Sequence, residues 1–242
     1  ERLFDSYRRI NGLLQGHPCM KTPGVEIAGG SLGIGLSVAA GMALGNRYQG
    51  YKGRVYCMMG DGEINEGQIW ESAATSAGFG LDNLCAFVDV NGLQNDAPTK
   101  EVKDMGDLAA KWKAFGWNVQ EINGHDFNEI LDALDQARAT KGKPSVILAH
   151  TVKGKGVPFM ENVVVWHGKT PSKEDYEKAI IEQVKDLEYI FLAGYMRIIS
   201  TYFLENYKKT SLNLHPSLLP KYKGKDEIAQ AYNAGDKEIR IS

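Results

Sequence analysis

Short apolar runs alternate with stretches of helical composition along most of this chain, and that alternation restricts the fold more than any other feature. The runs that predict strands are 54–59, 84–90, 118–122 and 145–150. The stretches that predict helices are 35–48, 66–79, 107–115 and 127–140. Strands that alternate with helices form a parallel sheet covered by helices on both faces. We therefore predict a doubly wound α/β domain.

Two further segments flank this alternation. Residues 3–15 have helical composition, and residues 16–33 form a loop that is dense in glycine and proline. A charged helix is expected at 172–186, because Ser172 suits an N-cap and Glu174 and Asp175 suit the positive end of the helix dipole.

Two oxygen-bearing side chains end consecutive strands. Asp61, between Gly60 and Gly62, follows the first run, and Asn91 ends the second run, thirty positions after Asp61. Parallel strands end at one edge of a sheet, so both side chains can bind one hard cation, and the glycines let a bulky ligand approach. This pattern indicates a diphosphate held through Mg²⁺. Gly-Asp-Gly alone is also an ordinary turn, and the ligand is favoured by the partner asparagine and by the segment 63–71, which opens a helix rich in small residues.

Composition excludes several classes of protein. The 242 residues are 43% hydrophobic and 24% charged, enough to bury a core in one large or two small domains. A net charge of −2 and a pI near 6.3 give no case for nucleic acid or a membrane surface. No apolar run has the length of a membrane span, and the chain does not begin with Met, so a missing start is expected.

The three cysteines show no metal-binding spacing. Cys57 and Cys85 lie inside predicted core strands, and Cys19 lies in the loop before them. They are interpreted as reduced thiols of a cytoplasmic protein.

Several blocks of sequence, in order, resemble the N-terminal, diphosphate-binding subunit of a split transketolase over residues 1–183. The matching blocks are 16–18, 23–26, 30–33, 60–71, 90–94, 153–156, 159–162 and 166–168. The resemblance implies thiamine diphosphate and Mg²⁺ as cofactors. It also implies transfer of a two-carbon ketol unit between phosphosugars, by a dimer or heterotetramer that includes a C-terminal, pyrimidine-domain subunit.

The same resemblance implies the cofactor site. Asp61, Asn91 and the backbone carbonyl of Leu93 would bind Mg²⁺, with the two phosphates of the cofactor helping to complete an octahedron. Gly60 and Gly62 would let the diphosphate lie against the strand end. The positions that match the aminopyrimidine side of the family's site are Gly30 and Leu32.

Three further positions match family residues of the reaction centre. His17 matches a histidine near the reacting carbon, although a histidine before proline can also be a plain turn residue. His167 resembles a histidine near the diphosphate. Glu66 matches a glutamate that reaches across the dimer interface; its alternative role is to stabilise the first turn of a helix.

Other polar residues are left with two interpretations. Lys153 and Lys155 could contact phosphates or belong to a solvated loop. His125 is expected in a turn before a helix capped by Asp126, and His150 either lines the cleft or packs beside it.

The sequence changes character from about residue 184. The blocks 189–198, 213–220, 221–224 and 236–238 resemble phosphoribosylglycinamide formyltransferase instead, over residues 184–242. The Asn-x-His pair of that family falls on Asn213 and His215, which would polarise a formyl group and stabilise an oxyanion. The family's catalytic aspartate would follow Ser242, and its phosphate-binding loop has no counterpart here. We expect this truncated α/β segment to pack on the first domain or to be poorly ordered, because so short a segment buries little core.

The resemblance also defines what this sequence does not supply. In the family, the glutamate that activates the cofactor belongs to the pyrimidine-domain chain, so the single chain is expected to be an incomplete catalyst. One alternative is a non-catalytic chimera of two truncated domains. A weaker alternative is formyl transfer from a folate.

Overall fold

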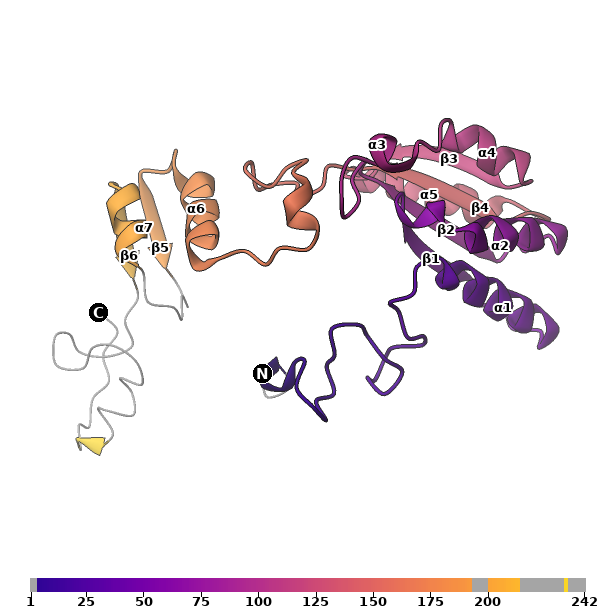
Figure 1. The fold of residues 1–242 in the computed structure, drawn as a ribbon, viewed down its shortest axis with the longest axis horizontal. Coiled ribbons are helices and arrows are strands. Elements are labelled where there is room, and N and C mark those ends of the chain that lie inside the picture. Colours follow the sequence, from indigo (N-terminus) through magenta and orange to yellow (C-terminus); the bar gives the residue numbers. More distant parts are fainter. Residues whose placement is uncertain (1–3, 193–199, 214–232, 235–242) are drawn as a thin grey trace. The chain divides into compact units, whose positions relative to one another are not determined.

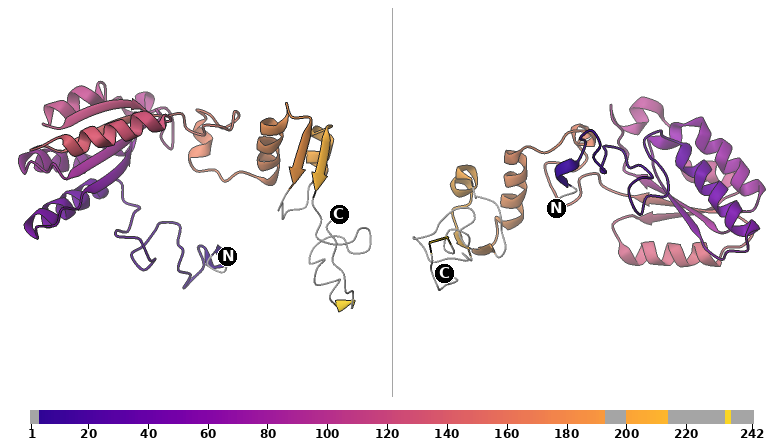
Figure 2. Two further views of the ribbon diagram at one scale, coloured as in Figure 1. Left: turned by 180° about the vertical axis from the view of Figure 1, so that it is seen from behind. Right: turned by 90° about the horizontal axis from the view of Figure 1, so that it is seen from below.

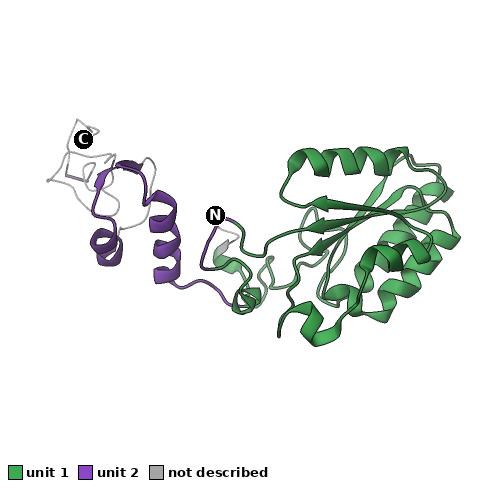
Figure 3. Cartoon of the chain, turned by 90° about the horizontal axis from the view of Figure 1, so that it is seen from above, with its two compact units in different colours: residues 1–155, 160–168 green, residues 156–159, 169–242 purple. Residues whose placement is uncertain are grey.

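The computed structural model describes residues 4–192, 200–213 and 233–234, and it forms two compact units. Unit 1 comprises residues 1–155 and 160–168, and unit 2 comprises residues 156–159 and 169–242 (Figure 3). The division between the two units falls before residue 184, where the sequence resemblance changes from transketolase to formyltransferase. Because a division in space does not show which family a segment belongs to, the boundary at residue 184 stays a prediction. Among the described residues, no helix is both long enough and apolar enough to cross a membrane.

Unit 1 is built on a sheet of four parallel strands in the order β1-β2-β4-β3 (Figure 1). The strands are β1 (Val55–Gly60), β2 (Leu84–Val90), β3 (Asn118–Asn123) and β4 (Ser145–His150). Each agrees with its predicted range to within one residue. Their register pairs Gly60 with Asp89 and Val90 with His150, so β1, β2 and β4 end at nearly the same level.

Helices cover both faces of this sheet. On one face lie α1 (Ile34–Tyr48), α2 (Gly67–Gly78) and α4 (Leu108–Ala114), and on the other lies α5 (Phe127–Ala139) (Figure 2, right). Side chains alternate along β2: Ala86 and Val88 join the core under α1, α2 and α4, while Cys85 joins the core under α5. The prediction of an α/β fold with a parallel sheet is confirmed.

The shorter elements of unit 1 were not predicted, and one predicted helix is absent. The short elements are η1 (Phe4–Ser6), η2 (Glu63–Asn65), α3 (Thr99–Lys103) and η3 (Val164–His167). The helix expected at 3–15 was wrong, because only η1 is helical there. Arg8 and Asn11 have φ angles of 57° and 65°, which a right-handed helix does not allow, and the Arg8 N–H donates to the Leu14 carbonyl at 2.9 Å.

Unit 2 contains a small parallel pair of strands packed on a helix. Its elements are α6 (Lys173–Val184), β5 (Tyr189–Leu192), α7 (Thr201–Asn206) and β6 (Thr210–Asn213). The predicted cap of α6 is confirmed, because Ser172 and Asp175 form a reciprocal capping box. The apolar residues of this core are Ile180, Ile181, Val184, Ile190, Phe203 and Tyr207. The described part of the tail therefore shares its core with α6, which ends at Val184.

Candidate functional site

Asp61 lies directly after β1 and is almost fully buried, with 5% of its surface exposed. Its Oδ2 atom accepts a hydrogen bond of 2.6 Å from the Gly92 N–H, while its Oδ1 atom is buried without a partner. Burial raises the pKa of Asp61 above the ordinary aspartate value. Backbone hydrogen bonds from Gly92 and Gly62 offset part of this shift, and the nearby Asp89 charge adds to it. A buried carboxylate oxygen without a protein partner is stabilised by a cation, a proton or an ordered water.

The loop that follows β2 lies against Asp61. Gly92 adopts a left-handed conformation, with φ of 74°, and its N–H reaches the Asp61 carboxylate. The Asn91 Oδ1 atom accepts from the Leu93 N–H at 2.9 Å. The loop 91–93 therefore lies against Asp61, although the side chains of Asp61 and Asn91 line different cavities. The roles of these residues as Mg²⁺ ligands remain a prediction.

Glu63 joins two glycine positions around this site, and sequence reasoning missed it. Its carboxylate accepts from the Gly33 N–H at 2.9 Å and from the Gly60 N–H at 3.2 Å. The loop before α1 is thereby tied to the end of β1. An acidic residue two positions after Asp61 was the only available signal, and it does not reveal a contact thirty residues away.

The predicted glycines differ in their surroundings. A Cβ atom on Gly62 would lie 3.0 Å from the Cβ of Gln94, so this glycine permits the strand end to pack against the loop after Asn91. A Cβ atom on Gly60 would meet no atom within 4 Å. Space beside Gly60 is therefore available for a ligand, as the prediction requires.

The glycine- and proline-rich loop brings His17 to Gly30. A Cβ atom on Gly30 would lie 3.1 Å from the imidazole of His17, so the ring lies against the glycine backbone. His17 is exposed, and Leu32 exposes 61% of its surface. Both side chains can therefore meet a ligand or a partner chain.

Glu66 and His167 are exposed as well. Glu66 occupies the N-cap position of α2 without a side-chain capping bond, so the described contacts do not use its carboxylate there. His167 ends η3, and a Cβ atom on the next residue, Gly168, would lie 3.8 Å from Asn95 Oδ1. The fold thus places the His167 segment beside the loop that follows Asn91.

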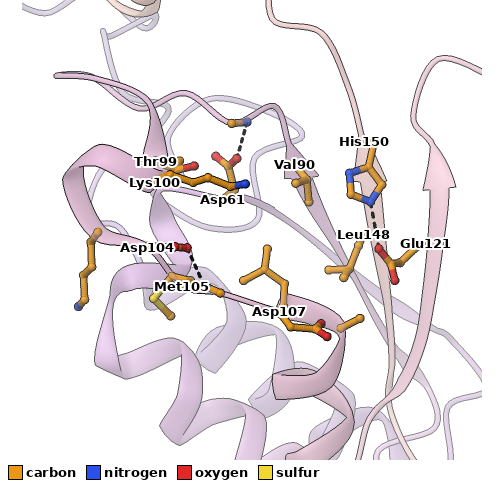
Figure 4. Close-up of a pocket in the computed structure, with 15 residues that line it drawn as sticks. Asp61, Val90, Thr99, Lys100, Asp104, Met105, Asp107, Glu121, Leu148 and His150 are labelled. Carbon is orange, nitrogen blue, oxygen red and sulfur yellow. Dashed lines mark hydrogen bonds and ion pairs between the residues drawn. The ribbon is translucent and has the colours of Figure 1, made fainter.

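Two cavities flank the ends of the strands, one on each face of the sheet. The first, of about 300 Å³, is lined by residues that include Asp61, Lys100, Glu121 and His150 (Figure 4). In it, His150 Nε2 lies 3.1 Å from Glu121 Oε2, so this histidine lines a cleft.

The second cavity, of about 550 Å³, is lined by residues that include Asn91, His125, Thr151 and Lys153. His125 Nε2 accepts from the Val152 N–H at 2.8 Å, and Asp126 caps α5 as predicted. Lys153 and Asn91 line the same cavity, so the phosphate contact stays a prediction beside the solvated-loop interpretation.

A cation at this site would need ligands besides carboxylates and imidazoles. Within the described part of the chain, no three or more His, Cys, Asp or Glu side chains are grouped so that they could hold a metal ion. The predicted set has one carboxylate, one amide, one carbonyl and the phosphates of the cofactor. This donor set is all oxygen, which suits Mg²⁺.

Comparison with known protein families shows which family this chain belongs to. The family model described as "Transketolase, thiamine diphosphate binding domain" matches residues 3–186. The chain belongs to this family. The prediction of a transketolase-type, thiamine diphosphate-binding transferase component is therefore confirmed at the level of the family.

Curated relatives include proteins that are named as transketolase subunits. The chain is 42% identical over 185 residues to the 6-deoxy-6-sulfo-D-fructose transketolase subunit of a Clostridium species, covering 76% of this chain and 67% of the relative. It is 39% identical over 184 residues to a subunit of the apulose-4-phosphate transketolase of Phocaeicola vulgatus, covering 76% and 66%. The chain thus spans about two thirds of these relatives.

Longer transketolases match as well. Transketolase-like protein 2 of Bos taurus is 38% identical over 226 residues, or 92% of this chain and 35% of that protein. The solved structure of Campylobacter jejuni transketolase matches with a TM-score of 0.71 and 31% identity, over 76% of this chain and 30% of that one. An alignment covering 92% of the chain must continue past residue 186. None of these matches assigns residues 184–242 to a formyltransferase.

Proposed function

We propose that this chain holds thiamine diphosphate and Mg²⁺ for transfer of a two-carbon ketol unit between phosphosugars, together with a pyrimidine-domain chain. One observation carries the proposal: in a member of the thiamine diphosphate-binding family, Asp61 keeps a buried, unpartnered oxygen beside the loop 91–93. A cation would give this oxygen a partner at the position where the family signature expects Mg²⁺.

The residues present fit both cofactors. Asp61 Oδ1, Asn91 Oδ1 and the Leu93 carbonyl would hold Mg²⁺, and the open space at Gly60 would admit the diphosphate. Lys153, beside Asn91 in the second cavity, would add a positive charge towards the phosphates. When bound, thiamine diphosphate supplies the carbon–carbon bond chemistry of the reaction.

The exposed residues would act on the sugar and the partner. His17 lies against Gly30 and is free to exchange hydrogen bonds with a sugar hydroxyl, and His167 would act near the diphosphate. Leu32 would contact the aminopyrimidine side of the cofactor. Glu66, exposed at the start of α2, would reach a neighbouring chain in a dimer or heterotetramer.

The relatives support a proposal for the partner and the substrate class. Two of them are named as transketolase subunits, so we propose a separate C-terminal subunit for this chain. Their names specify a sulfo sugar and a sugar phosphate. A phosphosugar is therefore the substrate class that we would test first.

The experiment is a calorimetric titration of thiamine diphosphate into the full chain, with and without Mg²⁺. We expect binding that requires Mg²⁺ and disappears in Asp61→Ala. Unchanged binding in that variant would exclude the assigned ligands. A repeat titration with a transketolase C-terminal subunit tests whether the partner is needed to hold the cofactor.

Two other functions have weaker support. The parallel β5-α7-β6 arrangement, with Asn213 as the last residue of β6, is compatible with the formyltransferase-like interpretation. His215 lies outside the described residues. Folate-dependent formyl transfer that vanished in His215→Ala would support it. A non-catalytic chimera would instead show no stabilisation by any of these cofactors, because a ligand that binds only the native state must raise its stability.

A further inference from the structure

Asp89 lies between the two residues predicted to bind Mg²⁺, although no sequence motif points to it. It is the last residue but one of β2 and pairs with Gly60 in the sheet. Its backbone carbonyl accepts a hydrogen bond of 3.1 Å from the Asp61 N–H. The main chain of Asp89 therefore joins the two strand ends that carry the site.

Both oxygens of the Asp89 carboxylate are already engaged. Oδ2 accepts from the Asn91 amide nitrogen at 2.9 Å, and Oδ1 accepts from the Thr151 hydroxyl. Thr151 follows β4, and its own N–H donates to the Val90 carbonyl at 3.2 Å. Asp89 is thus held from two sides and is poorly placed to be a metal ligand itself.

These contacts determine which end of the Asn91 amide faces which neighbour. An ionised carboxylate only accepts hydrogen bonds, so the NH₂ end of Asn91 must face Asp89. The Leu93 N–H only donates, so the oxygen end must face the loop 91–93. The same loop reaches Asp61 through Gly92.

We propose that Asp89 is a positioning residue, which holds the amide oxygen of Asn91 towards the cation while Thr151 holds Asp89. The proposal rests on the proposed function, since it assigns the cation to Asp61 and Asn91. A flipped amide would present its NH₂ group to Mg²⁺, which an octahedral oxygen site cannot accept. Residues that orient metal ligands in this way typically change metal affinity 10- to 100-fold when mutated.

Asp89 also places a second negative charge near Asp61, which would attract a cation regardless of amide orientation. Two variants separate these effects. Asp89→Ala removes both the charge and the acceptor for Asn91. Asp89→Asn removes the charge but keeps a carbonyl oxygen that can accept from Asn91, while its NH₂ group can donate to Thr151.

The test measures the Mg²⁺ concentration that gives half-maximal thiamine diphosphate binding to the full chain. We expect Asp89→Ala to raise this concentration about 10- to 100-fold, and Asp89→Asn to recover part of the loss. Thr151→Val, which removes one of the two anchors of Asp89, should raise it several-fold. Asp135→Asn is the matched control, because it makes the same charge change on an exposed residue of α5 and should cause no shift.

A double-mutant cycle distinguishes positioning from a general loss of structure. If Asp89 acts through Asn91, Asp89→Ala should cause little further shift in an Asn91→Ala background. The melting temperature of each unliganded variant is measured in parallel, because a purely structural role would lower it without changing the Mg²⁺ dependence selectively. Should Asp89→Ala fail to fold, Asp89→Asn and Thr151→Val carry the same cycle.

The outcomes separate this proposal from the one it rests on. Binding that Asn91→Ala weakens but that the Asp89 and Thr151 variants leave unchanged would overturn the positioning role alone. Independent, additive effects of Asp89→Ala and Asn91→Ala would overturn it too. A wild-type chain that shows no Mg²⁺-dependent binding, alone or with a transketolase C-terminal subunit, would overturn both proposals.

Discussion

Asp61 illustrates at the residue scale how a ligand site can lower the stability of the empty protein. Its pKa in the folded chain is raised by burial, so the folded state favours the protonated form. The contribution of Asp61 to the free energy of unfolding is therefore most favourable at acidic pH, and it is lost as the pH rises through the raised pKa. At neutral pH the ionised side chain destabilises the unliganded protein.

We therefore predict that Asp61→Asn stabilises the unliganded chain at pH 7 by about 1 kcal/mol, because a buried amide costs less than a buried charge. The melting temperature should rise by about 2–4 °C. The gain should shrink as the pH falls to where Asp61 is protonated, and Mg²⁺-dependent cofactor binding should be lost. Calorimetric scans across pH, with Asp135→Asn as control, test this; an unchanged or lower melting temperature at pH 7 would contradict it.

The cysteines give a second prediction at this scale. Burial raises the pKa of both Cys57 and Cys85 to about 11, with the Glu63 charge adding to the shift at Cys57. At pH 8 only about one thiol in a thousand would be a thiolate, the reactive form. Native protein should therefore react with a thiol reagent quickly only at Cys19, which is partly exposed. Denaturant should release the other two, and fast labelling of three thiols in the native state would contradict the burial.

At the scale of elements, substitution by alanine should change the stability of the chain in opposite directions at two glycines, one at the N-cap of α1 and one inside this helix. Gly33, at the N-cap, has φ of 85°, and a Cβ atom there would lie 2.9 Å from the Cβ of Glu66. Gly33→Ala should destabilise unit 1 by about 2–3 kcal/mol and disturb the bond from Gly33 to Glu63.

Gly41 is the matched control within the same helix. It is exposed, and a Cβ atom there would meet nothing within 4 Å. Gly41→Ala should stabilise α1 by about 0.5–1 kcal/mol, because alanine loses less backbone entropy in a helix. Urea denaturation of both variants tests the pair, and similar midpoints would show that the backbone at Gly33 is not restrained as described.

The same scale shows why the sheet could be predicted and the first segment could not. Each strand is a compact apolar run, so its bounds follow from composition. Residues 3–15 have helical composition, yet Arg8 and Asn11 adopt left-handed conformations and the segment folds back on itself. Local propensity is weak, and contacts made within the loop outweigh it here.

For the whole molecule, the site residues of the first family all lie in unit 1. A chain ending at residue 172 should therefore bind thiamine diphosphate with Mg²⁺ within about threefold of the full chain, since it keeps every one of these residues. A loss of binding would show that unit 2 contributes to the site. Calorimetry on both chains makes the comparison.

A second cut serves as control. A chain ending at residue 186 keeps Ile180, Ile181 and Val184 of α6 but removes their partners, such as Phe203. We expect it to associate more readily than the shorter chain, because the uncovered residues form an apolar patch. Light scattering measures the association of the two shortened chains, and so tests whether the apolar residues of α6 need this core to cover them.

The sequence by itself determined the family, the parallel sheet and the residues that end its strands, because these depend on local composition and on motifs of fixed spacing. Asp61 and Asn91 were accessible from their places after two strands, and Leu93 only through the family resemblance. Only the tertiary structure decided which oxygen of Asp61 lacks a partner and which end of the Asn91 amide faces the site. Those facts depend on contacts such as Thr151 with Asp89, 62 residues apart, which the register of β2 and β4 creates.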